Sequence, residues 1–277
     1  MTSEVARDRR RMRRTYPRSR AQQLVDACED REDKAATLTL DLSGLGAQRF
    51  TSRLYDLSHL TRLALANNQL TRLNPDIKFL DCLEVLDLRS NQLKKLPVEL
   101  EELVHLKVLL LGDNKLTTYP GNIYKLSQLE NFDISSNRLP AVVVEVGNME
   151  LLKDTHEWEV GVGLLQRLEQ LSAANNSITV WPGQVEKVRT LKMLNLAHNA
   201  VTEVPTVIEQ NFNILYLDLS HNDIESLPVE IYKLRFLETF KMSHNKLSEF
   251  PPVPPPQVIK DFDDTDVFVS ILCNNVV

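Results

Sequence analysis

Apolar residues recur along most of the chain in a fixed frame of 23 positions. Within each unit they stand at positions one, four, six and eleven, and an asparagine stands at position nine. The eight units that keep this frame begin at Leu60, Leu83, Leu106, Leu129, Leu168, Leu191, Ile214 and Leu237. Because positions four and six are two residues apart, they share one face of an extended chain. The pattern therefore predicts eight short strands whose equivalent side chains enter one continuous core.

Proline and asparagine mark the turns of each unit. Six units have proline at position fifteen, namely Pro97, Pro120, Pro182, Pro205, Pro228 and Pro251. Its fixed φ ends the strand-and-turn half and suits an extended or short helical return segment. Asparagine has both a donor and an acceptor, so we expect it to satisfy backbone groups where the chain leaves the sheet. We interpret as structural the asparagines at position nine: Asn68, Asn91, Asn114, Asn137, Asn176, Asn199, Asn222 and Asn245.

The repeated motif, L-x-x-L-x-L-x-x-N-x-L-x-x-L-P-x-x-L-x-x-L, resembles that of leucine-rich repeat proteins. Its 23-residue form with the LP pair is similar to the intracellular Ras-suppressor and Scribble group, over about 190 residues. The resemblance implies an α/β solenoid: a leucine-rich repeat horseshoe with a parallel concave β-sheet, about eight full repeats and degenerate terminal repeats. It also implies use as a protein-binding scaffold. Stacking is required physically as well, since one unit cannot bury its leucines alone.

The ends of the array depart from the frame. Residues 37–59 have apolar residues at the strand positions but Leu45 in place of asparagine, which indicates a degenerate first repeat. Upstream, residues 21–36 include Val25 among apolar residues at helical spacing, so we expect an amphipathic helix that caps the first repeat.

The C-terminal residues 251–277 begin with a cluster of prolines and then recover the apolar frame at Val269 and Ile271. They predict a proline-rich segment followed by a truncated capping repeat, which closes a solenoid of residues 37–250. The alternative is that this last edge accepts a strand from a partner.

One interval is longer than the others. The units that begin at Leu129 and Leu168 are 39 residues apart, and the excess predicts an insertion at residues 150–167. One interpretation is a segment packed on the convex side. The other is a partner contact centred on Trp158, because long excursions are often functional and aromatic residues are favoured interface anchors.

The concave face of the sheet is the expected binding surface. Positions four and six point into the core, so positions three, five, seven and eight should face outward from the sheet. The candidate partner-binding residues are Arg62, Asp87, Arg89, Leu110, Asp133, Met193, Asn195, His198, Tyr216, Asp218, His221, Lys241 and His244. This mixed surface suits a protein ligand better than the uniformly basic groove expected for nucleic acid.

Three of these residues, His198, His221 and His244, occupy position eight of successive units and should stand side by side across the sheet. Such a row raises the hypotheses of a metal site and of a pH sensor. No cysteine or carboxylate at matched spacing completes a tetrahedral set, although Asp218 lies close in sequence. We therefore interpret the three as ordinary surface histidines and expect no metal.

Composition limits the class of protein, the cellular location and the activity that we expect. The 277 residues are 43% hydrophobic and 25% charged, as in a globular protein, with no apolar run of the roughly 18 residues that a membrane span needs. The three cysteines are widely spaced and an N-terminal signal is lacking, so we expect a reducing compartment, namely the cytoplasm. Mitochondrial and cytoskeletal or ciliary locations are the alternatives. Nucleotide-binding and hydrolase motifs are lacking, and there are only eight glycines, so we expect no enzymatic activity, cofactor or small-molecule substrate.

The net charge of −6 conceals a basic arm on an acidic body. Residues 1–20 have a net charge of +6, and the rest of the chain, with 24 basic and 36 acidic residues, has −12. The arm contains Arg7, Arg9, Arg10, Arg11, Arg13, Arg14, Arg18 and Arg20. Three interpretations stay open: a solvated disordered tail, electrostatic docking to RNA or an acidic protein surface, and a cleaved targeting sequence.

The leading functional expectation is a non-enzymatic scaffold or adaptor that binds a protein on its concave face. The alternative is a structural subunit of a large assembly, ribonucleoprotein or cytoskeletal, anchored by the arginine-rich arm.

Overall fold

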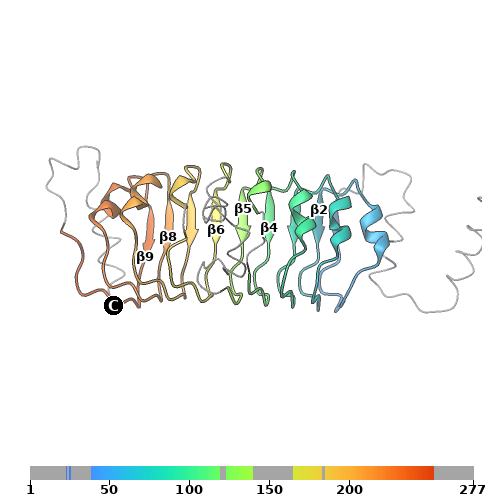
Figure 1. Ribbon diagram of the computed structural model, residues 1–277, viewed down its shortest axis with the longest axis horizontal. Helices are drawn as coiled ribbons and strands as arrows, with labels where there is room; N and C mark the ends of the chain where they lie inside the picture. Colours follow the sequence, from blue (N-terminus) through green and yellow to red (C-terminus); the bar gives the residue numbers. More distant parts are fainter. Residues whose placement is uncertain are drawn as a thin grey trace, which may run out of the picture.

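Nine strands form a single parallel sheet in sequence order (Figure 1). The computed structural model describes Gln23, Val25 and residues 39–118, 123–139, 165–182 and 185–252. The strands are β1 (Thr39–Asp41), β2 (Arg62–Ala64), β3 (Val85–Asp87), β4 (Val108–Leu110), β5 (Asn131–Asp133), β6 (Gln170–Ser172), β7 (Met193–Asn195), β8 (Tyr216–Asp218) and β9 (Thr239–Lys241). Equivalent positions pair throughout, as Leu63 does with Leu86. The predicted solenoid with a parallel sheet is confirmed, and the degenerate first repeat supplies β1.

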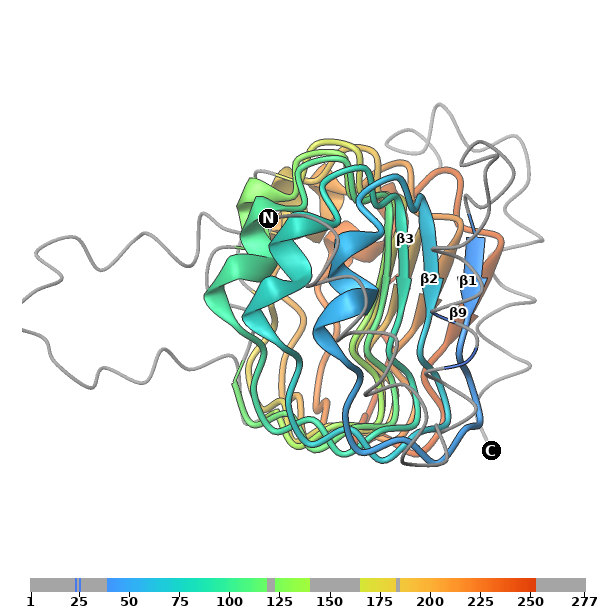
Figure 2. The same cartoon turned by 90° about the vertical axis from the view of Figure 1, so that its right-hand side faces the viewer.

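Short 3₁₀ helices form a second layer opposite the sheet (Figure 2). They are η2 (Ser52–Asp56), η3 (Pro75–Phe79), η4 (Val98–Glu102), η5 (Ile123–Lys125), η6 (Val185–Lys187), η7 (Thr206–Gln210) and η8 (Val229–Lys233). Pro97, Pro205 and Pro228 each precede one of them, with φ between −73° and −72° and ψ between 149° and 152°. Proline already has a φ near these values, so the ring lowers the entropy cost of entering the helix. Of the two forms expected after position fifteen, extended or short helical, these three repeats have the short helical one.

The core is the stack of leucines between these two layers. Leu86 and Leu109, at the centres of β3 and β4, are fully buried. Val25, which lies in helical conformation before the first repeat, is also buried in this core. Burial of one leucine side chain contributes about 1.5–3 kcal/mol, so the repeated frame supplies the main stabilisation.

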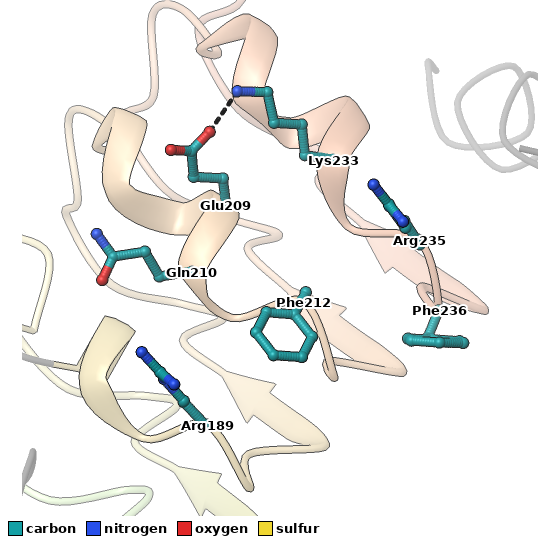
Figure 3. A pocket seen from close by; sticks show the side chains of 7 residues that line it. All are labelled: Arg189, Glu209, Gln210, Phe212, Lys233, Arg235 and Phe236. Carbon is teal, nitrogen blue, oxygen red and sulfur yellow. Dashed lines mark hydrogen bonds and ion pairs between the residues drawn. The ribbon is translucent and has the colours of Figure 1, made fainter. Parts of the chain in front are cut away.

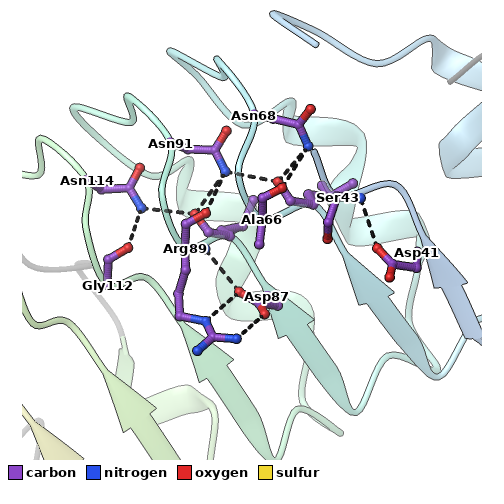
Figure 4. A network of polar contacts seen from close by, with 11 residues as sticks. Asp41, Ser43, Ala66, Asn68, Asp87, Arg89, Asn91, Gly112 and Asn114 are labelled. Carbon is purple, nitrogen blue, oxygen red and sulfur yellow. Dashed lines mark hydrogen bonds and ion pairs between the residues drawn. The ribbon is translucent and has the colours of Figure 1, made fainter. Parts of the chain in front are cut away.

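The asparagine of position nine links neighbouring repeats, as Figure 4 shows for three of them. The Asn91 side-chain amide donates to the carbonyls of Leu65 at 2.9 Å and Leu88 at 3.0 Å, and its Oδ1 accepts from the Leu70 N–H at 3.0 Å. Leu65 and Leu70 belong to the preceding repeat, so one side chain satisfies backbone groups of two coils. Corresponding bonds are formed by all eight asparagines, which confirms their structural interpretation.

Position eight, directly before this asparagine, has a left-handed backbone. Its φ lies between 51° and 57° in all eight units, although none has glycine there. These residues are Asn67, Ser90, Asp113, Ser136, Asn175, His198, His221 and His244. In the degenerate first repeat the equivalent residue is Gly44, with φ 69°. Non-glycine residues in this region cost about 1–3 kcal/mol, which the asparagine bonds offset.

The longer interval does not interrupt the sheet. Strands β5 and β6 pair with Phe132 opposite Leu171, as neighbouring strands do elsewhere. Trp158 and most of the expected insertion lie outside the described residues, as do the arginine-rich arm, most of the expected N-terminal helix and the expected C-terminal capping repeat. In the described ranges, no helix has both the length and the hydrophobicity needed to cross a membrane.

Candidate partner-binding surface

The outward face of the sheet brings eight of the thirteen predicted residues into two polar clusters and one row of rings. Positions three and five of each strand flank the buried position four and are less buried than it in most strands. Arg62, Leu110 and Met193 lie at these positions in β2, β4 and β7. The polar clusters lie on β3 and on β8 with β9.

The first cluster is the ion pair of Asp87 and Arg89 (Figure 4). The guanidinium donates Nη2 to Asp87 Oδ2 at 2.7 Å and Nε to Oδ1 at 3.0 Å. The hydrogen bond with Asp87 raises the pKa of Arg89, and the charge of Asp133, on β5 two strands away, adds to the effect. Because the Arg89 side chain is half exposed, the pair contributes at most about 1 kcal/mol to stability. Its main effect is to hold a charged, planar group in one orientation.

The second cluster joins Tyr216, Asp218 and Lys241. The Tyr216 hydroxyl donates to Asp218 Oδ2 at 2.9 Å and accepts from Lys241 Nζ at 3.0 Å. The ammonium also lies 3.8 Å from Asp218 Oδ2 and 5.1 Å from the centre of the Tyr216 ring. These contacts, first of all the hydrogen bond with Tyr216, raise the pKa of Lys241. An aromatic ring and an ammonium group are thus fixed side by side on the surface.

Position five has a second, structural function that the sequence analysis missed. In five repeats its side-chain oxygen accepts a hydrogen bond of 2.9–3.0 Å from the backbone N–H of position seven. The residues are Asp41, Asp87, Asp133, Asn195 and Asp218. Such turns suit Asp and Asn because their short side chains reach the backbone two residues on. The recurrence of Asp or Asn at position five was the available signal.

The three histidines form a stack across the sheet, as their spacing predicts. The ring centres of His198 and His221 are 4.0 Å apart, those of His221 and His244 are 4.1 Å apart, and each pair is tilted by 11°. Desolvation, followed by the charges of His198 and His244, lowers the pKa of His221, while Asp218 acts in the opposite direction. The lowered pKa favours the neutral form of His221. Within the described ranges, no three His, Cys, Asp or Glu residues are placed to hold a metal ion.

Two family models match the chain. One, described as a leucine-rich repeat region, matches residues 38–158, and the other, described as a leucine rich repeat, matches residues 189–247. The chain belongs to the leucine-rich repeat proteins. The finer resemblance to the Ras-suppressor and Scribble group is not confirmed by these models. No curated protein shows significant sequence similarity to the chain.

Solved leucine-rich repeat structures have a similar fold. The ectodomain of the plant membrane receptor kinase GASSHO1/SCHENGEN3 from Arabidopsis thaliana, in complex with CASPARIAN STRIP INTEGRITY FACTOR 2, has a TM-score of 0.61 and 25% identity. The match covers 72% of this chain and 23% of that one. The plant peptide hormone receptor RGFR1 in complex with RGF2 has a TM-score of 0.62 and 27% identity, over 73% of this chain and 31% of that one.

An internalin, InlF from Listeria monocytogenes, has a TM-score of 0.62 at 21% identity, over 81% of this chain and 59% of that one, and shows the fold alone. The chain spans less than two thirds of the length of each of these three structures. Leucine-rich repeat domains generally mediate protein–protein interaction.

Proposed function

We propose that this protein is a non-enzymatic interaction scaffold whose concave sheet binds a protein partner. The observation that carries the proposal is the cluster of Tyr216, Asp218 and Lys241 beside the histidine stack. Tyrosine is one of the residues that most often dominate binding energy at protein interfaces. Here its hydroxyl is held by two partners, so less side-chain freedom is lost when a ligand covers it.

The charge pattern of this face supports a protein ligand over a nucleic acid. Acidic Asp87 and Asp218 lie beside basic Arg89 and Lys241 on this face. A polyanion would meet the carboxylates on β3, β5 and β8, whereas a folded protein or peptide can place a complementary group at each point. The two plant receptors above, solved in complex with CASPARIAN STRIP INTEGRITY FACTOR 2 and with RGF2, have a similar fold.

The test is quantitative affinity purification from cells with wild-type protein and with the double variant Tyr216→Ala, Lys241→Ala. We expect the amount of each specific partner recovered with the variant to be at least about tenfold lower than with wild type. This is the effect of removing one interface hot spot. Phe79→Ala is the matched control, because Phe79 is exposed on the opposite layer. Far-UV circular dichroism and melting temperature should be unchanged in both variants. Identical partner sets for all three proteins would refute the proposal.

The second candidate function, a structural subunit of a large assembly anchored through the arm, rests on the eight arginines within residues 1–20. Deleting these residues discriminates the two. Under the scaffold proposal, partners survive the deletion and vanish with the concave double variant. Under the alternative, association is lost on deletion and weakens steeply with salt in the full-length protein.

We place the scaffold in the cytoplasm, consistent with Cys82, an exposed free thiol.

A further inference from the structure

Two further surfaces lie outside the concave sheet, and they differ in how their charges are compensated. On the helical layer, a groove of about 550 Å³ is lined by residues at and after the ends of η6, η7 and η8, among them Phe212 and Phe236 (Figure 3). In this groove Glu209 and Lys233 are already paired with each other. The other surface is the edge of the solenoid at which the strands end, on the lower side of Figure 1.

Positions twelve and thirteen of each repeat form this edge. They stand between two buried positions, as residues 71 and 72 do between Leu70 and Leu73, so their side chains point outward. Neighbouring coils stay in register here, since the N–H of Glu225 donates to the carbonyl of Thr202 at 3.3 Å and both residues are at position twelve. Equivalent side chains therefore form rows along the edge.

The charge of these rows changes sign from one end of the solenoid to the other. With the coils numbered one to nine after β1 to β9, coils one to three have only positive charges at positions twelve and thirteen, and coils seven to nine have only negative ones. The positive residues are Arg49, Arg72, Lys94 and Lys95, and the negative residues are Glu203, Glu225 and Glu249. All seven are exposed. Within the described part of the chain, their side chains form no hydrogen bond and no ion pair, so their charges are available to a partner.

The middle of the edge separates the two signs. Coils four and six are uncharged at these positions, with Thr117, Thr118, Thr179 and Val180, and the fifth coil lies outside the described residues there. Position ten, nearby, does not share the pattern: Lys115 and Arg138 are positive, and Asp223 and Lys246 are paired with each other at 2.8 Å. The change of sign is therefore a property of positions twelve and thirteen.

The pattern is complementary to itself when the solenoid is turned end for end. Coil one then lies opposite coil nine, coil two opposite coil eight and coil three opposite coil seven. The opposed pairs are Arg49 with Glu249, Arg72 with Glu225, and Lys95 with Glu203. We propose that this edge binds the same edge of a second copy of the chain, in an antiparallel dimer with two-fold symmetry. A two-fold interface requires such a self-complementary surface, and each pair occurs twice in it.

The dimer is expected to be weak and sensitive to salt. Nine coils about 4.8 Å apart span about 38 Å, and a strip of this length a few side chains wide is at the low end of interface sizes. Ion pairs between exposed groups are screened by salt. A two-fold axis that reverses the coils leaves both concave sheets on the same side, so the dimer presents two copies of the candidate binding surface. The inference does not depend on the concave-face proposal.

The test is the dimer dissociation constant of the full-length protein, measured by analytical ultracentrifugation. We expect a monomer–dimer equilibrium with a Kd below about 0.5 mM in 50 mM NaCl, weakened at least fivefold in 300 mM NaCl. The double variants Arg49→Glu, Arg72→Glu and Glu225→Lys, Glu249→Lys each place like charges opposite one another. Each should dimerise at least tenfold more weakly than wild type.

Charge-swap rescue tests the antiparallel arrangement itself. An equimolar mixture of the two double variants should form a heterodimer at least as tight as the wild-type dimer, because opposite charges again face each other. The quadruple variant that combines all four substitutions has the wild-type net charge with the polarity of the outer coils reversed. It should dimerise within threefold of wild type.

Matched controls separate the edge from other surfaces. Lys187→Glu, Arg189→Glu makes the same change of net charge at exposed residues on the helical layer, and should alter the Kd less than twofold. The concave double variant Tyr216→Ala, Lys241→Ala should also dimerise normally, so the two proposals fail separately. Deletion of residues 1–20 should leave the dimer intact. Circular dichroism should show the same fold in every variant.

Four results would overturn the inference. They are a wild-type protein that is monomeric at 0.5 mM, a quadruple variant that dimerises no better than the double variants, a helical-layer variant as weak as the edge variants, and loss of the dimer on deletion of the arm. In the last case the glutamates of coils seven to nine bind the arginine-rich arm and not a second edge.

Discussion

The hydroxyl of Tyr216 donates a hydrogen bond to the carboxylate of Asp218, two residues later in the same strand and 2.9 Å away. Side chains two apart in a strand share one face, so the sequence places this pair together without help from the rest of the fold. Asp218 is 7% exposed and its other oxygen accepts the backbone N–H of Ser220. The Asp218 carboxylate thus stabilises the turn after β8 and orients the Tyr216 ring on the candidate binding surface.

The pKa of Lys241, which donates a hydrogen bond to the Tyr216 hydroxyl, provides a first test. Tyr216→Phe keeps the ring but removes the hydrogen bond that contributes most to the raised pKa of Lys241. We expect that pKa to fall towards its ordinary value, as measured by NMR titration of the lysine side chain. A raised pKa in the folded state stabilises the fold below the ordinary pKa, and this contribution is lost as pH rises through the raised value. An unchanged Lys241 pKa would show that the hydrogen bond is not formed in solution.

The asparagine ladder predicts a large loss of stability from one substitution. Asn91→Ala leaves the buried carbonyls of Leu65 and Leu88 and the N–H of Leu70 without their partner. We expect the free energy of unfolding to fall by about 2–4 kcal/mol, since each unsatisfied buried group costs about 1–3 kcal/mol and the site relaxes in part. Urea unfolding measures the change. Lys95→Ala, an exposed change in the same repeat, should stay within about 0.5 kcal/mol. Equal unfolding midpoints for the two variants would contradict a ladder that links the coils.

Core packing gives a third expectation. Leu109 is fully buried at the centre of β4 and lies opposite Leu86 and Phe132 in the neighbouring strands. Leu109→Ala should therefore reduce the free energy of unfolding by about 2–5 kcal/mol, the cost of an unfilled cavity. Val98→Ala is the control, because Val98 is 72% exposed and loses little contact on truncation. A small effect at Leu109 would mean that neighbouring coils collapse onto the gap.

The histidine stack predicts a dependence of stability on pH. The pKa of His221 is lowered in the folded state, chiefly by desolvation and then by His198 and His244, against the opposing charge of Asp218. As pH falls below the ordinary value of 6.5, the unfolded chain takes up the proton first, so the fold loses stability. The melting temperature should fall between pH 7.5 and pH 5.5, and less steeply in His221→Gln. Replacement of His105, an exposed histidine outside the stack, should leave the slope intact. A steeper or unchanged slope in His221→Gln would contradict the lowered pKa.

Much of the sheet could be predicted because its determinants repeat. Leucines at positions four and six, such as Leu86 and Leu88, fix which face is buried, and the constant spacing fixes the register. The role of Asn91 followed from the donor and acceptor of its side chain. The row of histidines followed from equal positions in successive units, since equivalent residues of stacked coils are neighbours.

Other features could not be predicted from this frame. Asp87 and Asp218 accept hydrogen bonds from backbone N–H groups two residues later, and these bonds depend on the backbone geometry after the strand. Position eight there has a positive φ although its residue is not glycine. The groove around Phe212 depends on the segments that follow the 3₁₀ helices η6, η7 and η8. A strand pattern with period two does not determine which side chains of these segments are exposed. The frame of positions one, four, six and eleven therefore does not predict that Phe212, at position 22, is 41% exposed.

Strands β5 and β6 keep the common register although Phe132 and Leu171 are 39 residues apart, against 23 for other neighbours. Loop closure becomes less favourable only by about 0.6 kcal/mol for each doubling of loop length, so this junction tolerates additional chain. It is therefore a natural place to graft a reporter domain or an epitope, because the tag would enter between two coils while the strands on both sides continue to pair as before.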